Sequence, residues 1–133
     1  MVQATDLRIG NWVRSGDSAG RISQILVSEI EMSFIVEGGN QLRLYRYEDI
    51  EAISLTPAII NACEFYRHEL FPHRNAFHHP KFILNINIVG STYEVSFGLI
   101  PDNVAIIYQR TLFLHQLQNL YYLLTNQELT VML

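Results

Sequence analysis

The sequence predicts an α+β fold, and three observations lead to it. Short apolar stretches separated by turn residues fill residues 7–55. A segment with the signals of a helix start follows at residues 54–70, and three further strand-like stretches precede an amphipathic segment at residues 114–129. We therefore expect an N-terminal β-lobe over residues 1–55. Residues 56–133 should hold a connecting helix, an antiparallel three-stranded meander and a C-terminal helix that packs on it, in a lobe that shares one core with the first.

The first lobe is predicted from four short stretches, LRIGNWV (7–13), RISQILV (21–27), EMSFIVE (31–37) and QLRLYRY (41–47). In the last stretch, Leu42 and Leu44 alternate with Arg43 and Tyr45, which is typical of a strand. The tripeptide Gly38-Gly39-Asn40 can adopt the positive φ angles of a tight turn, so residues 31–47 should form a hairpin. A lobe this small cannot form a sandwich, and a strongly bent SH3-like small β-barrel is the economical alternative.

A helix of about three turns is expected within residues 54–70. Thr56 can cap the first amides, Pro57 suits the first helical position, and apolar residues follow at helical spacing. The next stretch, residues 71–82, contains Pro72 and Pro80 and should be a loop or an extended arm.

The meander is predicted over residues 81–109, with turns at Gly90-Ser91 and Pro101-Asp102-Asn103. Alternation in its first strand places Ile86 and Ile88 on a dry face, and Asn85 and Asn87 on a face toward solvent.

The C-terminal helix is predicted from an apolar stripe that should face the meander, formed by Leu114, Leu117, Leu120, Tyr121 and Leu124. The opposite side carries His115, Gln118, Asn119 and Tyr122. We expect His115 to bond a backbone carbonyl or cap the helix start, and Gln116 and Asn119 to satisfy nearby backbone groups. Asn126 can take the left-handed turn that ends the helix, and residues 128–133 should form a closing edge strand.

Composition limits the class of protein. The 133 residues are 49% hydrophobic and 17% charged, which favours a core-rich or self-associating protein over a disordered chain. The net charge of −4 gives no basic footprint, so nucleic acid is not favoured as a partner. The single cysteine, Cys63, cannot form an internal disulfide, and no leader sequence or membrane span is evident. We expect a cytoplasmic protein without a membrane association.

Three segments together resemble a family of small uncharacterised proteins from Bacteroidales-type gut bacteria and their phages and mobile elements. They are LRIGNWV (7–13), ISLTPAIINACEFY (53–66) and HQLQNLYYLLTNQEL (115–129). Members typically carry glycine where this chain has Glu64 and Asn126. Asparagine tolerates positive φ, but Glu64 does not readily, so the first helix is expected to run on toward His68. The resemblance implies a small cytoplasmic accessory protein and carries over no catalytic residue.

The expected interaction surface consists of aromatic and histidine side chains, namely Trp12, Tyr45, Tyr47, Phe71, Phe77, His78, His79, His115 and Tyr122. Trp12 with Tyr45 and Tyr47 can line a peptide groove, although a core role for Trp12 is the stronger interpretation. Phe71, Phe77 and Phe82 lie among the histidines of the arm and can dock on a neighbouring lobe or subunit.

Enzymatic sites are not favoured by the pattern. His68, His73, His78 and His79 are typical zinc ligands by residue type, but their spacing matches no metal signature and no cysteine pair accompanies them. His115 lacks a recognisable nucleophile context, and Cys63 lies among apolar residues, where a thiol is usually inert. We assign no catalytic, cofactor-binding or metal-binding residue, and expect no cofactor.

The function expected from these observations is a non-enzymatic protein-interaction or accessory module of phage or mobile-element type, with a protein partner or self-association. Two alternatives stay open. One is a nucleic-acid-associated small β-barrel protein, which would need one basic face formed by Arg8, Arg14, Arg21, Arg43 and Arg46. The other is a metal-dependent enzyme that uses the arm from His68 to His79.

Overall fold

A computed structural model gives the α+β fold of the chain and describes residues 4–67, 76–79, 84–89, 92–97, 105–110 and 112–133. The chain divides into two compact units. The first unit comprises Met1–Ser54 and Phe113–Glu128, and the second comprises Leu55–Leu112 and Leu129–Leu133. The C-terminal helix thus belongs with the N-terminal strands.

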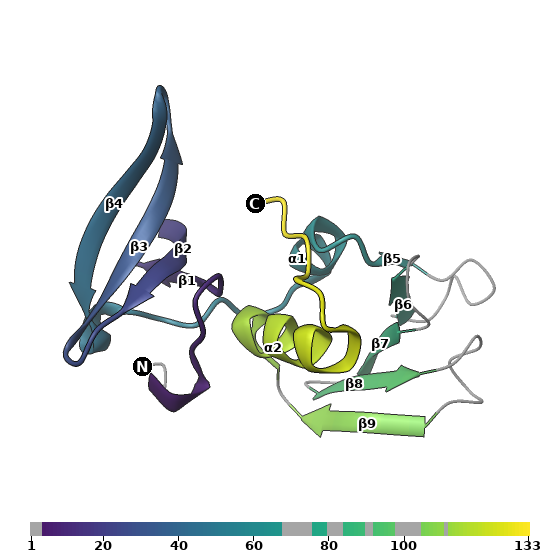
Figure 1. Ribbon diagram of the computed structural model, residues 1–133. Coiled ribbons are helices and arrows are strands. Elements are labelled where there is room, and N and C mark those ends of the chain that lie inside the picture. Colours follow the sequence, from purple (N-terminus) through teal and green to yellow (C-terminus); the bar gives the residue numbers. More distant parts are fainter. Residues whose placement is uncertain (1–3, 68–75, 80–83, 90–91, 98–104, 111) are drawn as a thin grey trace. The chain divides into compact units, whose positions relative to one another are not determined.

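The first unit contains a four-stranded antiparallel sheet (Figure 1). Its strands are β1 (Trp12–Ser15), β2 (Ser18–Ile25), β3 (Glu29–Val36) and β4 (Gly39–Arg46), and they neighbour one another in chain order. Short 3₁₀ turns flank them, η1 (Ala4–Asp6) before and η2 (Tyr47–Asp49) after.

The predicted hairpin of residues 31–47 is confirmed. Strands β3 and β4 pair without a register shift from Glu29 opposite Arg46 to Val36 opposite Gly39. Gly38 and Gly39 have φ angles of 90° and 136°, which a residue with a side chain rarely adopts. The turn itself is Glu37–Gly38, one residue earlier than predicted, because Gly39 and Asn40 already pair with β3 as part of β4.

The described strands do not close into a barrel. Strands β1 and β4 lie at the two ends of the sheet order and do not pair with each other. One further segment reaches β1, because Arg14 and Glu51 exchange backbone hydrogen bonds of 3.0 and 2.8 Å. The coarse α+β prediction is confirmed, whereas the SH3-like closure is not established by this sheet.

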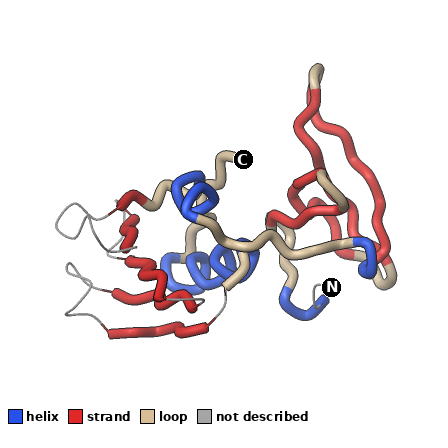
Figure 2. Tube along the Cα trace, turned by 180° about the vertical axis from the view of Figure 1, so that it is seen from behind, coloured by secondary structure: helices blue, strands red, loops and turns tan. Residues whose placement is uncertain are grey.

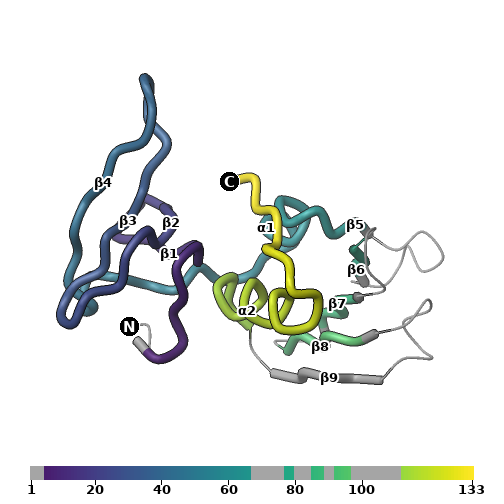
Figure 3. The backbone as a smooth tube through the Cα atoms, viewed as in Figure 1, coloured from purple at the N-terminus to yellow at the C-terminus, as the bar shows by residue number. Residues whose placement is uncertain are grey.

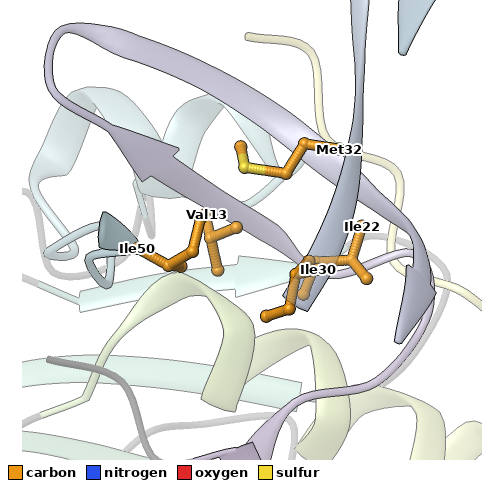
Figure 4. Close-up of a cluster of buried hydrophobic side chains, with 5 residues drawn as sticks. All are labelled: Val13, Ile22, Ile30, Met32 and Ile50. Atoms are coloured by element: carbon orange, nitrogen blue, oxygen red, sulfur yellow. The ribbon is translucent and has the colours of Figure 1, made fainter. Parts of the chain in front are cut away.

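The core of the first unit consists of five apolar side chains from three strands and the segment after η2, namely Val13, Ile22, Ile30, Met32 and Ile50 (Figure 4). Ile30 and Met32 are two residues apart on β3, so the pleat directs both to one face. Burial of each such side chain contributes about 1.5–3 kcal/mol relative to exposure. This cluster holds the sheet together on its inner face.

Helix α2 (Leu114–Thr125) begins and ends as its sequence predicts. Gln116 Oε1 accepts a hydrogen bond of 3.0 Å from the backbone N–H of Phe113. Asn126 adopts φ 57° and ends the helix, and its N–H donates to the Tyr122 carbonyl at 2.8 Å. Leu114, Leu117 and Tyr121 of the apolar stripe are buried. Contact of this stripe with the meander stays a prediction.

In the second unit, helix α1 (Pro57–Ala62) is shorter than predicted. Thr56 and Pro57 start it as expected, with Ile59 N–H donating to Thr56 Oγ1 at 3.2 Å. The extension toward His68 is wrong, because Glu64 takes φ 64°.

The end of α1 is a Schellman motif built around Glu64. The N–H of Phe65 donates to the Ile60 carbonyl at 3.2 Å, and the N–H of Glu64 donates to the Asn61 carbonyl at 3.0 Å. This pairing satisfies helix-end carbonyls, and it outweighs the cost of a left-handed glutamate. Glu64 and Asn126 are therefore both left-handed helix ends, the conformation for which glycine is best suited.

The second unit holds a five-stranded sheet in chain order (Figure 1). Its strands are β5 (Tyr66–Arg67), β6 (Ala76–His79), β7 (Leu84–Val89), β8 (Thr92–Phe97) and β9 (Ala105–Arg110). The predicted meander is present as β7, β8 and β9. Residues 76–79 pair with β7 and belong to the sheet, so the prediction of a loop or arm is wrong there.

One face of the meander differs from the prediction. Ile86 is buried as expected, but Asn85 on the supposed solvent face is buried too, and so is Ser96 of β8. These two residues lie directly opposite each other on β7 and β8, and His78 of β6 lies opposite Asn85. Strand β6 extends the sheet beside them, which two-residue alternation within β7 alone does not reveal.

The closing edge strand predicted at residues 128–133 is not formed, since no strand occurs there. Leu129 is buried, and the Met132 N–H donates to the Ala62 carbonyl at 2.9 Å. The segment thus runs beside the end of α1 and joins no sheet. Neither α1 nor α2, the α-helices in the described ranges, is long and apolar enough to span a bilayer.

The left-handed conformation of Glu64 leads to a stability prediction. Glu64→Gly should raise the free energy of unfolding by about 1 kcal/mol, because glycine removes the steric cost of positive φ. Glu64→Ala is the matched control: it also removes the carboxylate but keeps that cost, so it should bring no gain. Thermal and denaturant unfolding measure both variants, and a Glu64→Gly variant no more stable than Glu64→Ala would contradict the assignment.

Candidate functional site

A pocket of ≈ 300 Å³ opens on the first unit's sheet. It is lined by residues from the start of β2, the end of β3 and the middle of β4, namely Ser18, Ala19, Phe34, Ile35, Val36, Gln41, Arg43 and Tyr45. Strand pairing explains how these residues meet, since Phe34 lies opposite Gln41 in the β3–β4 register. Phe34, Gln41, Arg43 and Tyr45 therefore share one face of the hairpin.

An aromatic pair lines the pocket. The rings of Phe34 and Tyr45 lie edge to face, with centroids 6.1 Å apart and planes at 67°. Both also pack against the hydrophobic core. Gly20 permits this position, because a Cβ atom there would lie 2.9 Å from Phe34 Cε1 and 2.9 Å from the Ser33 carbonyl. The backbone of β2 thus approaches the Phe34 ring closely, and a side chain at position 20 would displace it.

Arg43 supplies the charge of the pocket and is the one ionisable group other than Tyr45 that lines it. With the Gln41 amide oxygen turned toward it, Arg43 donates from Nη2 and Nε at 3.1 and 3.2 Å. Within the described ranges Arg43 has no carboxylate partner, unlike Arg14, which pairs with Glu51 at 3.1 Å. The guanidinium is therefore oriented by Gln41 and available to an anionic group.

The pocket is suited to binding. Its aromatic pair can contact an apolar side chain, and Arg43 can pair with a carboxylate. Ser18 is its sole hydroxyl apart from Tyr45, and no histidine or carboxylate that might activate Ser18 lines the pocket. The residues present therefore support recognition of an apolar and acidic segment.

The polar side of α2 forms a second, separate group of contacts, which we call the amide clamp and define as Gln118 and Asn119. Gln118 Oε1 accepts from the Trp12 N–H at 2.7 Å, and Gln118 Nε2 donates to the Gly10 carbonyl at 3.1 Å. Asn119 Nδ2 donates to the Asp6 carbonyl at 2.8 Å. In Figure 3 the segment before β1 runs beside α2, where these bonds form.

Further polar contacts extend the amide clamp to the surface. Asn119 Oδ1 accepts from Asn11 Nδ2 at 2.8 Å and from Arg8 Nε at 3.1 Å. Arg8 also forms a bidentate ion pair with Glu128. Its Cζ atom lies 4.6 Å from the centroid of the Tyr122 ring. The polar face of α2 is therefore occupied by the protein's own N-terminal segment.

His115 has an unusual environment on the same helix. Its side chain is buried, its Nδ1 atom has no hydrogen-bond partner, and its ring stacks on Phe113 at 6.2 Å. The predicted bond to a backbone carbonyl or helix cap is therefore wrong for Nδ1. Burial lowers the pKa of His115 below its ordinary value, while the negative charge of Asp6 raises it in part.

The residues predicted as an interaction surface lie in different places. In the first unit, Tyr45 lines the pocket, whereas Trp12 is 8% exposed and Tyr47 donates its hydroxyl to the Leu26 carbonyl at 2.6 Å. His115 is buried, and Tyr122 lies under Arg8.

The remaining predicted residues belong to the second unit. Phe77 and His79 are buried, His78 is half-buried, and Phe71 lies outside the described residues. The structure therefore leaves Tyr45 as the member of the predicted set that lines the pocket.

The histidine arm is not assembled into a metal site in the described part of the chain, where no group of three or more metal-ligating side chains occurs. His78 and His79 are neighbours on β6 and so project to opposite faces. His79 Nε2 lies 4.0 Å from Glu64 Oε2, and its ring meets Phe65 edge to face. His68 and His73 fall outside the described residues.

Cys63 is buried and free. Burial raises the pKa of its thiol to about 12, so the thiolate is scarce at neutral pH. This environment agrees with the structural role expected from its apolar neighbours.

Sequence patterns pointed to Tyr45 and, as part of a basic face for nucleic acid, to Arg43, but they missed Phe34 and Gln41. The alternation of β3 and β4 contained the missing signal, because a hairpin with its turn at Glu37–Gly38 brings Phe34 opposite Gln41. Comparisons with protein-family models, with curated proteins and with solved structures find no match to this chain.

The buried imidazole of His115 predicts a pH dependence of stability. Its pKa is lowered in the folded state, so the unfolded chain takes up a proton first as the pH falls below the ordinary value of 6.5. The free energy of unfolding should therefore fall from about pH 7 to about pH 5. His115→Gln should flatten this slope relative to the wild type in urea unfolding series, and an unchanged slope would contradict the assignment.

Proposed function

We propose that this protein is a non-enzymatic interaction module whose first unit binds a peptide segment of a partner protein. The observation that carries the proposal is the pocket lined by the Phe34–Tyr45 pair and by Arg43. An aromatic pair offers apolar contact area, and an arginine without a carboxylate partner favours an acidic group beside it. Aromatic side chains that contact the apolar residues of a peptide, beside an arginine that contacts an acidic residue, are typical of peptide recognition.

The SH3-like interpretation belongs to the same proposal. It is supported by the order of elements, in which a meander is followed by the 3₁₀ turn η2 and a return segment. The backbone of Glu51 in that segment forms an antiparallel bridge with Arg14 of β1. Strand β1 pairs with β2 on its other side. This is where a bent sheet of this size would close, since closure requires the last segment to reach the first strand.

The biological setting follows from the resemblance to the phage and mobile-element family. On that basis we place the module among accessory proteins acting in the cytoplasm. Self-association is a further mode that the hydrophobic composition of 49% favours.

The nucleic-acid alternative has less support. Of the five arginines that it needs, Arg8, Arg14 and Arg46 are paired with carboxylates at the surface. Pairing of this kind reduces the positive charge available to phosphates. The metal-dependent alternative has no assembled ligand group in the described ranges.

Selection from a random peptide display library tests the proposed function. Wild-type protein should enrich peptides that carry an apolar residue close to aspartate or glutamate. Arg43→Gln should weaken their binding by about tenfold or more, since a charged pair is lost. Tyr66→Phe, a conservative change at an exposed tyrosine of the second unit, is the control and should bind as wild type. Circular dichroism confirms that each variant is folded.

Two outcomes would contradict the proposal. One is that no peptide is enriched over repeated selections. The other is that enriched peptides bind equally well to Arg43→Gln and to Tyr45→Leu, which removes the hydroxyl and the ring while retaining an apolar side chain. Either result would mean that the pocket is not the binding site.

A further inference from the structure

Strand β4 forms an edge of the first unit's sheet. It pairs with β3 alone, and in the described part of the chain no other group hydrogen bonds to its backbone. All eight of its residues are exposed except Tyr45, which is half-buried. Figure 2 shows β3 and β4 as a long pair of strands, with β4 on the outside. Its outward amide and carbonyl groups are thus free to pair with another strand.

The opposite edge of the sheet is treated differently. On β1, the N–H of Trp12 is bonded by Gln118, and Arg14 exchanges backbone hydrogen bonds with Glu51. The protein therefore covers one edge with its own groups and leaves the other open. Proline residues and β-bulges commonly block pairing at a sheet edge. Strand β4 contains no proline, and its register with β3 contains no bulge.

The two faces of β4 have distinct chemistry. On one face, Leu42 and Leu44 are 56% and 53% exposed, and Ser33 and Glu31 of β3 lie opposite them. Ile35 of β3, which lies opposite Asn40 on the same face, is 83% exposed. On the other face, Arg43 stands between Gln41 and Tyr45 at the pocket. A strand added to this edge would alternate its side chains between an apolar face and a basic face.

The charge of β4 selects the sign of the partner. The strand carries Arg43 and Arg46 and no aspartate or glutamate. Arg46 is engaged by Glu48 and Asp49 at 3.1 and 3.2 Å, so Arg43 is the cation of β4 that has no carboxylate partner among the described residues. An opposite charge placed directly across from Arg43 stabilises a strand pair, and a like charge destabilises it.

We propose that β4 binds an extended partner segment by strand addition, and that this segment alternates apolar and acidic residues. Its apolar side chains lie against Leu42 and Leu44, its backbone pairs with the open edge, and a carboxylate lies beside Arg43. The proposal rests on the proposed interaction function and names the partner chemistry and binding mode of that site. A second copy of this chain fits less well, because a second β4 offers no carboxylate in any register.

A synthetic probe tests the proposal on the full-length protein. The probe is a blocked peptide in which valine and glutamate alternate over seven residues, and the comparison peptide has lysine in place of glutamate. Nuclear magnetic resonance titration should show the glutamate peptide binding at least about tenfold more tightly, with slowed hydrogen exchange at β4 amides. A glutamate peptide N-methylated along one edge should lose binding by a similar factor, because it cannot pair with the strand.

Charge reversal at one position sharpens the test. Arg43→Glu should invert the preference, so that the lysine peptide binds more tightly than the glutamate peptide. Arg21→Glu makes the same change on β2, outside the pocket, and should leave the preference of the wild type in place. Neither side chain is buried, so both variants should fold.

Four outcomes decide the matter. Charge inversion together with loss of binding by the N-methylated peptide supports strand addition. Strand addition is overturned if the N-methylated peptide binds as tightly as the unmodified glutamate peptide, or if the glutamate and lysine peptides bind equally well. In that case the proposed function still stands if display-selected ligands require Arg43. Concentration-dependent dimers that protect β4 and exclude the probe overturn it in favour of a second copy. Absence of both probe binding and display-selected ligands overturns strand addition and the proposed function together.

Discussion

The first unit depends on the amide clamp, in which two side chains of α2 hold the backbone of the N-terminal segment. The Gln118 side-chain amide accepts from the Trp12 N–H and donates to the Gly10 carbonyl. It thus forms the hydrogen bonds that the backbone of a neighbouring strand would otherwise form. Asn119 bonds to the Asp6 carbonyl and accepts from Asn11. Because the Trp12 N–H and the Gln118 side chain are buried, loss of these bonds would leave polar groups without water, which is costly. The first and last parts of the unit are thereby tied together.

Much of the architecture could be predicted from local patterns, while long-range polar contacts could not. Thr56, Pro57 and Asn126 marked helix ends correctly, because capping depends on residues close in sequence. The end of α1 was missed, since glutamate rarely adopts the left-handed conformation that Glu64 takes. The helical pattern placed Gln118 on a polar face, but it could not reveal that a segment more than a hundred residues away covers that face.

The two edges of the first sheet connect the fold with the proposed interaction. At β1, Gln118 and Glu51 occupy backbone groups that would otherwise attract another strand. At β4, the protein retains an open edge with apolar and basic faces. The pocket lies on the same strand, so side-chain recognition and backbone pairing can act on one partner segment. In the proposed binding mode, backbone pairing supplies affinity and Arg43 supplies selectivity.

Amide hydrogen exchange at Trp12, combined with unfolding of Gln118→Leu, tests the amide clamp most directly. The Trp12 N–H should exchange slowly in the wild type and much faster in Gln118→Leu, with a loss of about 2 kcal/mol in the free energy of unfolding. Gln127→Leu, the same change at an exposed glutamine of the first unit, should leave both quantities close to those of the wild type. A Trp12 amide that exchanges rapidly in the wild type, or a Gln118→Leu variant of unchanged stability, would contradict the account.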